Sequence, residues 1–334
     1  MSTQARIRLL VLLSVAALSV AVLLVITLGR APVNPPLPNP NGYDDFLKAG
    51  AAVPGSVSDF RALDHDGLRD LVAANAETLR LLRLGLTRQC SVPPEAAMTN
   101  TAGMLNDLSG MKRLVQLLAA EGRLREMDNQ PTEAARSYLD AIRFGNEISR
   151  GGFLINRLVG IACEAIGRSP LAKLVPSLKP EAARQIIAEL EKIEHTHVTW
   201  DEALRNENRF LRHQLRANPN PVIWATSLWQ LRGAMRRAAE KHNRVLACER
   251  LLAVELALRC YQAEKARPPA RLAELVPNYL SQVPPDPFTG QPLVYRPQGS
   301  NWLLYSIGPD GVDDGGKPVG RGSLSNGDLL FDSP

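Results

Sequence analysis

Apolar residues recur at steps of three and four along most of the chain between Tyr43 and about Ala266. The clearest example is a set of five residues at the spacing expected for one face of a helix, namely Leu105, Leu108, Met111, Val115 and Leu118. This part of the chain contains no run of alternating apolar and polar residues typical of a strand. The pattern predicts a body of roughly seven to nine helices.

Local signals mark where several of these helices begin and end. Pro131 and Pro180 are each followed closely by an acidic residue, and proline is tolerated in the first turn of a helix because that turn has no partner for its N–H. Gly151-Gly152 and the segment 218–221, Asn-Pro-Asn-Pro, interrupt the helical pattern. We expect helices on either side of both interruptions.

One pair of predicted helices resembles a tetratricopeptide repeat. Small and aromatic residues fall at the offsets used in that repeat, namely Leu118, Gly122, Ala134, Tyr138 and Ala141. No second copy follows 34 residues later, and a solenoid needs about three repeats to bury its faces. We therefore favour an ordinary helical hairpin over a repeat array.

Composition agrees with a mainly helical fold. The chain has 334 residues and is 45% hydrophobic, but only 5% aromatic, so its core must be built mostly from Leu, Ala, Val and Ile. Leu and Ala favour helix over sheet. We predict a mainly α protein with a transmembrane helix at its N-terminus, a multi-helix body over residues 43–244, and a small α+β subdomain within residues 245–334.

The N-terminal segment predicts the compartment. Residues 9–28 are uncharged and strongly apolar, and about twenty such residues span a bilayer. We interpret residues 9–29 as an uncleaved anchor rather than a removed signal peptide, whose apolar region is shorter. Arg6 and Arg8 would keep residues 1–8 in the cytoplasm. The remainder would lie outside the inner membrane, joined to the single anchor by the proline-rich linker 30–42.

Charge and cysteine content narrow the classes of partner. Net charge is +5, and residues 203–250 hold ten Arg and Lys against three Glu, so this stretch alone carries +7. That stretch is either a solvated helix face or a basic surface for an acidic partner or anionic lipid; nucleic acid is not expected for a domain outside the cytoplasm. The four cysteines, Cys90, Cys163, Cys248 and Cys260, lack zinc-site spacing and are either buried thiols or one disulfide.

Familiar catalytic motifs are missing from the sequence. We find no G-x-S-x-G, H-E-x-x-H, P-loop or G-x-G-x-x-G. Glu194 and His197 have the Glu-x-x-His spacing of some metal sites, with His195 between them, but no second such pair exists. We interpret this segment as a helix end. An enzyme with scattered catalytic residues, a periplasmic hydrolase, stays open, and a cavity holding His195, His197 and a carboxylate from another helix would favour it.

The last ninety residues have a different character. Short aromatic runs, Pro-Leu-Val-Tyr-Arg at 292–296 and Trp-Leu-Leu-Tyr-Ser at 302–306, lie between turns and predict strands. A helix ending near Ala266, then Asp286-Pro287-Phe288, then Tyr-Ser-Ile-Gly-Pro-Asp-Gly at 305–311 and a late Gly327-Asp328 follow in order. This order resembles the C-terminal domain of the major pseudopilins of type II secretion systems.

The resemblance implies a calcium site. In that family an aspartate of the Gly-x-Asp-Gly turn, a late aspartate and backbone carbonyls bind calcium, and the matching positions here are Asp310 and Asp328. Asp313 and Asp314 are additional acids, and the carbonyl of Ile307 could contribute. Calcium takes six to eight oxygen ligands. The alternative is that Asp and Gly only form tight turns.

The N-terminus departs from the family. Residues 1–13 carry no pseudopilin processing site, the apolar span has no glutamate, and the helical body has no counterpart there. The whole chain resembles membrane-anchored proteins of bacteria such as planctomycetes. We therefore expect a non-catalytic, membrane-anchored envelope protein that contacts a protein partner. The alternatives are an atypical pseudopilin of a type II secretion apparatus and the hydrolase.

Overall fold

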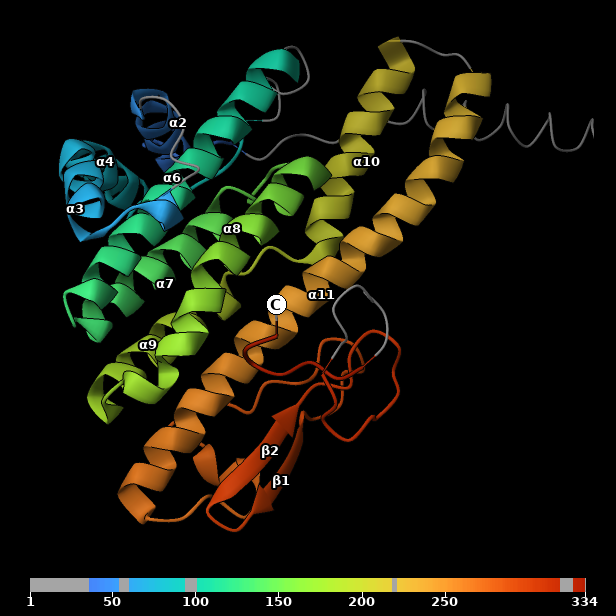
Figure 1. Ribbon diagram of the computed structural model, residues 1–334. Coiled ribbons are helices and arrows are strands. Elements are labelled where there is room, and N and C mark those ends of the chain that lie inside the picture. The colour runs from blue at the N-terminus through green and yellow to red at the C-terminus, as the bar shows by residue number, and fades with distance from the viewer. Residues whose placement is uncertain (1–35, 54–59, 94–100, 218–220, 319–326, 334) are drawn as a thin grey trace, which may run out of the picture.

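The computed structural model describes residues 36–53, 60–93, 101–217, 221–318 and 327–333 (Figure 1). Within these residues the protein is mainly helical, with a small two-stranded sheet, as predicted. The helices of the body are α2 (Gly42–Ala52), α3 (His65–Ala74), α4 (Ala76–Leu86), α6 (Thr101–Met127), α7 (Pro131–Glu147), α8 (Leu154–Leu174) and α9 (Pro180–His195). Two further helices are α10 (Trp200–Ala217) and α11 (Pro221–Lys265), and short 3₁₀ turns are η1 (Phe60–Ala62), η2 (Val175–Ser177) and η3 (Leu272–Leu275).

The predicted anchor at 9–29, the cytoplasmic residues 1–8 and the start of the linker lie outside the described residues. In the part of the chain that is described, every helix is too short or too polar to span a membrane. The linker ends at Asn41, whose side chain accepts a hydrogen bond from the Tyr43 amide and caps α2.

The predicted helix boundaries are confirmed where local signals are strong. Pro131 begins α7 and Pro180 begins α9, each in the first turn. Gly151 has a φ of +71° in the break between α7 and α8, a conformation that favours glycine. The break at 218–220 lies outside the described residues, and α11 begins directly after it at Pro221.

The body has two hydrophobic clusters. The first lies between α2, α4, α6 and α7, where the rings of Phe46 and Phe144 meet edge to face at 4.9 Å between centroids. The second lies between α7, α8, α9 and the C-terminal half of α11, and it also includes residues of the C-terminal segment. In Figure 1 the helices that surround these two clusters lie side by side and form the body.

Close packing of α6 on α7 explains the hairpin. Gly122 faces Tyr138, and a Cβ atom at position 122 would lie 2.4 Å from Cε1 of that ring. The small and aromatic residues therefore act as the sequence pattern indicated, to let two helices approach. The predicted apolar face of α6 is wrong at one residue. Leu105, near the start of the helix, is 53% exposed, whereas the other four predicted residues are buried, namely Leu108, Met111, Val115 and Leu118.

The helix α11 extends through two environments. Its C-terminal half, from Ala247 to Tyr261, contributes buried side chains to the second cluster. Its N-terminal half lies beside α10, and the two helices project from the body as an antiparallel pair (Figure 1). We call this pair the arm, residues 200–217 and 221–244. No residue of the arm belongs to either hydrophobic cluster within the described part of the chain.

The C-terminal segment packs on α11. Strands β1 (Val294–Gln298) and β2 (Asn301–Tyr305) pair antiparallel, and residues 306 and 329 exchange two backbone hydrogen bonds beside them. Leu304, Tyr305 and Leu329 are buried, and the indole of Trp302 donates to Glu255 of α11 at 2.8 Å. The expected boundary between body and tail, at residue 244, falls inside α11, so that helix connects both parts.

All four cysteines are free and buried. The disulfide alternative is therefore wrong, and the thiols act as small apolar side chains. Burial raises the pKa of Cys90 to about 12, which makes that thiol unreactive.

Candidate functional site

A buried group of charged side chains lies where α8, the α9–α10 connection and α11 meet. Arg157 of α8 is fully buried. Its guanidinium donates to both carboxylate oxygens of Glu164, about two turns further along the same helix, at 2.6 and 2.9 Å. The same guanidinium donates from Nε to Nδ1 of His242 at 3.1 Å and lies 3.2 Å from Nε2 of His197. Arginine cannot accept a hydrogen bond, so both imidazole nitrogens must be acceptors.

The two imidazoles are held in the neutral form. Burial, followed by the positive charge of Arg157, lowers the pKa of His242 to about 3 and that of His197 well below its usual range. The rings lie 5.3 Å apart between centroids, and Trp200 of α10 packs on His242 at 5.9 Å. These histidines are therefore hydrogen-bond acceptors for Arg157 and not acid–base groups at neutral pH.

Glu249 of α11 is the unusual member of this neighbourhood. It is 6% exposed, and its Oε1 atom is buried with no hydrogen-bond partner among the described residues. Burial, followed by the nearby charge of Glu164, raises the pKa of Glu249 well above its usual range. The shift favours the protonated, neutral form of Glu249, which can donate one hydrogen bond and accept another.

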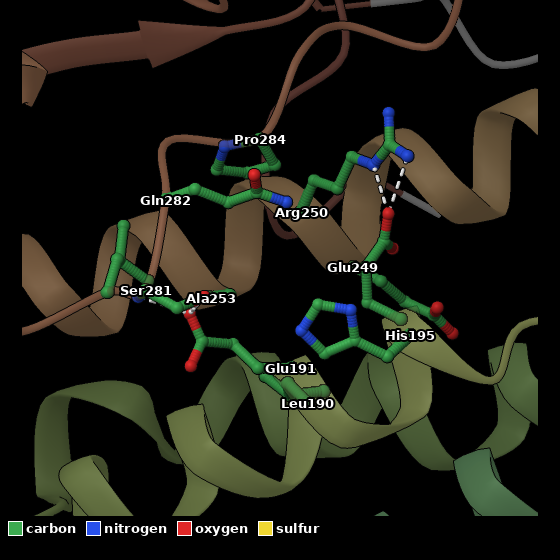
Figure 2. A pocket seen from close by; sticks show the side chains of 11 residues that line it. Leu190, Glu191, His195, Glu249, Arg250, Ala253, Ser281, Gln282 and Pro284 are labelled. Atoms are coloured by element: carbon green, nitrogen blue, oxygen red, sulfur yellow. Dashed lines mark hydrogen bonds and ion pairs between the residues drawn. The ribbon is translucent and has the colours of Figure 1, made fainter. Parts of the chain in front are cut away.

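Glu249 also lines a small cavity between α9, α11 and the loop 280–284 (Figure 2). Arg250 closes one side, donating to Glu194 at 2.5 and 3.0 Å and to the carbonyl of Pro285 at 2.7 Å. On the other side Glu191 accepts from both the amide and the hydroxyl of Ser281, at 2.7 and 2.8 Å. The rim is therefore closed by hydrogen bonds that join the loop to both helices.

The cavity has a volume of about 40 Å³. A water molecule occupies about 30 Å³ in the liquid, so the cavity has room for one small polar molecule. Chemically, the site can present a neutral carboxyl group to such a molecule. Glu191, Glu194 and Arg250 are occupied by their own partners.

His195 and His197, which are close in sequence, lie in two different surroundings. α9 ends at His195, which confirms the helix-end interpretation, and His195 lines the cavity while His197 turns to Arg157. Within the described residues, no group of three or more His, Cys, Asp or Glu side chains is placed to hold a metal ion. Of the three residues expected for a hydrolase, the cavity therefore holds one histidine and a carboxyl from another helix, Glu249.

The sequence did not indicate Arg157, Glu164 or Glu249 as special. The available signal was the seven-residue spacing of Arg157 and Glu164, which places an ion pair on one face of a helix. That face is rich in apolar neighbours, Ile161 and Leu171 among them, which is a hint that the pair is buried.

A second and much larger hollow, which we call the groove, lies between α4, α6, α7 and α9. Its volume is about 760 Å³, and four arginines and four carboxylates line it. Arg83 pairs with Glu121 at 2.5 Å and Asp140 at 2.8 Å across the groove. Arg143 is exposed in its wall and forms no ion pair within the described residues.

The C-terminal aspartates are partly brought together. The carboxylate oxygens of Asp310 accept from the Val312 amide at 3.2 Å and from the Gly327 amide at 3.1 Å, so Asp310 contacts the backbone of the residue that precedes Asp328. Asp328 is buried; its Oδ2 accepts from Gly316 at 2.6 Å, and its Oδ1 has no partner within the described residues. Burial raises the pKa of Asp328. The buried Oδ1 atom of Asp328, without a partner within the described residues, is the feature of this loop that fits a cation ligand.

The other predicted ligands fit less well. Asp313 accepts from the Tyr305 hydroxyl at 2.6 Å and from Arg296 at 2.9 Å, so both of its oxygens are occupied. Asp314 is half-buried near Asp328, and Ile307 uses its amide to bind Asp286 at 3.2 Å. Asp286, which is 2% exposed, joins two turns by also accepting from Phe288. The calcium site stays a prediction that rests on Asp310 and Asp328.

Function must be argued from these sites themselves. They comprise a small cavity with one neutral carboxyl group, a wide charged groove, and an aspartate pair in the tail. Comparison with protein families, with curated proteins and with solved structures finds no match to this chain.

Proposed function

We propose that the chain is a non-catalytic, membrane-anchored envelope protein whose helical body binds another protein. The observation that carries the proposal is the groove between α7 and α9, which at about 760 Å³ is far larger than the cavity at Glu249. Small-molecule pockets are lined mainly by hydrophobic side chains. Charged side chains lie in this groove beside apolar ones such as Leu139 and Ile186, and a mixture of apolar and polar contacts is typical of interfaces between proteins.

The occupant that fits is a protein segment carrying a carboxylate. Most charges in the groove already have partners, such as Arg136 with Glu133 at 2.7 Å. Arg143 is the exposed cation without an ion-pair partner among the described residues, so an incoming carboxylate would complete its pairing. The apolar span at 9–28 and the linker in the sequence support a partner in the envelope.

The test is photocrosslinking in intact cells. A benzophenone amino acid in place of Gln185, an exposed residue of the groove wall, should give one discrete adduct. Arg143→Glu should abolish the adduct. Arg69→Glu, a matched charge reversal on α3 outside the groove, should leave it unchanged. An adduct that survives Arg143→Glu contradicts the proposal.

The pseudopilin-like tail supports an alternative, an atypical component of a type II secretion apparatus. Processing distinguishes the two, because a pseudopilin is cleaved and methylated at its N-terminus. Intact mass of the purified protein measures this directly. A cleaved, methylated N-terminus would favour the alternative over an uncleaved anchor. A reporter fused after Pro334 that is active only outside the cytoplasm would support the expected orientation.

A hydrolase is the second candidate, favoured by one observation. The cavity places the neutral carboxyl of Glu249 on α11 close to His195 at the end of α9. A raised pKa suits a general acid. Hydrolysis of ester, peptide or glycoside substrates by the purified chain, lost in Glu249→Gln but retained in Glu240→Gln, would establish this function.

A further inference from the structure

The arm has a basic side that the body does not use. On α10, Arg205, Arg209 and Arg212 follow one another at steps of four and three, so they lie along one face of the helix. The polar residues of the neighbouring face are occupied by the body. Glu207 accepts from the Leu154 amide at 3.0 Å, and Asn206 donates to the Gly152 carbonyl at 3.0 Å.

The acidic residues of α10 that could neutralise the arginines are bound to the body instead. Glu202 and Glu207 both point to amides at the start of α8 and its preceding turn. Arg205 and Arg212 are exposed and form no ion pair in the described part of the chain. On α11, Arg237 and Lys241 are likewise exposed without an ion-pair partner there. The arm therefore carries positive charge that is not compensated within the body.

We propose that the arm binds the phosphate headgroups of an anionic lipid surface. The proposal takes the membrane anchor from the proposed function, but it does not involve the groove. Guanidinium groups bind phosphate oxygens in a bidentate manner, and polybasic segments close to an anchor are attracted to anionic lipid.

The length of the chain outside the structure supports this partner. The linker of about a dozen residues before α2 spans at most about 37 Å as an extended polyproline helix at ~3.1 Å per residue. α10 has 18 residues, which makes it about 27 Å long. A body held so close to the bilayer lies within reach of it along the arm. In Figure 1 the free end of the arm and α2, where the linker enters, lie on the same side, away from the β hairpin.

The test uses the full chain in lipid nanodiscs. A cysteine replaces Asn208, an exposed residue of α10, and carries a fluorescent donor; the four native cysteines are buried and react slowly. Energy transfer to a headgroup-labelled lipid measures how close the arm lies to the surface. Transfer should be higher in discs containing phosphatidylglycerol than in phosphatidylcholine discs, and salt should reduce the difference.

Charge reversal gives the decisive comparison. Each positive charge removed should weaken the attraction about fivefold, so Arg205→Glu/Arg212→Glu should abolish the lipid dependence. The matched control, Arg69→Glu/Arg80→Glu on α3 and α4, should retain it. Equal energy transfer in phosphatidylglycerol and phosphatidylcholine discs overturns the proposal, and this result would be expected if the arm bound an acidic protein. Equal loss of the lipid dependence in both double variants also overturns it.

Absence of membrane insertion can be distinguished from absence of lipid binding by the arm. A chain that does not enter discs elutes apart from them by size exclusion, which contradicts the proposed function and not this inference. Flotation of that chain with phosphatidylglycerol vesicles then gives the result. Flotation lost in Arg205→Glu/Arg212→Glu supports lipid binding by the arm, and no flotation overturns it.

Discussion

Replacing Arg157 with methionine should destabilise the protein severely, because its partner would stay behind. Arg157 and Glu164 have 0% exposed side chains, and the guanidinium supplies two hydrogen bonds to the carboxylate. Removing one member of a buried ion pair costs about 3–5 kcal/mol, since the other charge is left without compensation. At about 2 °C per kcal/mol, the low end for larger domains, the melting temperature should fall by roughly 6–10 °C.

The loss should depend on pH. The positive charge of Arg157 helps to lower the pKa of His242, whereas Glu164 raises it. Without Arg157, the His242 pKa should rise, and protonated His242 can replace the guanidinium as partner of Glu164. A folded pKa below the unfolded value of 6.5 costs stability as pH falls through that value, and a rise in the folded pKa of His242 makes this cost smaller. The variant should therefore be less destabilised near pH 6 than near pH 8.

The assay is thermal unfolding of the detergent-solubilised full chain, followed by far-ultraviolet circular dichroism. Arg157→Met/Glu164→Leu should recover most of the loss, because replacing a whole buried pair by apolar groups is close to neutral. Arg136→Met, at an exposed pair with Glu133, is the control and should cost less than about 1 kcal/mol. A single variant that melts with wild type, or a double variant no better than the single, would refute the reasoning.

Three further outcomes are expected. Millimolar calcium should raise the melting temperature relative to chelator, and magnesium should raise it much less. Asp328→Asn should remove the effect of calcium. Wild-type protein that melts at the same temperature with calcium and with chelator excludes the metal site. Gly122→Ala should cost about 1–3 kcal/mol by chemical denaturation, because its Cβ would overlap Tyr138, and a neutral result would mean that the hairpin can separate at little cost. Glu249→Gln should stabilise the protein increasingly as pH rises above the ordinary glutamate pKa of 4.5, because a carboxyl group whose folded pKa is raised costs stability there. Glu240→Gln is the matched control in the same melting series. A gain independent of pH would contradict a raised pKa of Glu249.

Features determined by neighbouring residues could be predicted from the sequence. Pro131 and Pro180 restrict the backbone locally, so the helix starts followed from them. The strands of the tail were recognisable because aromatic runs lie between turn residues. The closeness of Gly122 and Tyr138 was also accessible, since a helical hairpin brings residues of adjacent helices together with few alternatives.

The buried charges could not be predicted, because their partners are distant in sequence. Arg157 and His242 are 85 residues apart, and no local pattern indicates which helix faces cross. The same limit applies to Asp313, an additional acid of the predicted calcium loop, because its partner Arg296 lies on β1 and occupies one of its oxygens. Leu105 failed for a different reason, since a helix keeps its apolar period beyond the point where a neighbouring element covers it.

The way the tail joins the core affects the order in which the chain can fold during synthesis. Leu329 is fully buried in the second cluster, and the carbonyl of Phe331 accepts from Arg168 of α8 at 3.3 Å. The ribosome delivers α8 more than 150 residues before these partners, so Arg168 and the cluster around it remain incomplete while the rest of the chain emerges. Helices α2 to α7 can assemble early around the first cluster. The second cluster closes only once the segment at 328–331 is released, which gives chaperones a long interval in which to bind an incompletely folded chain.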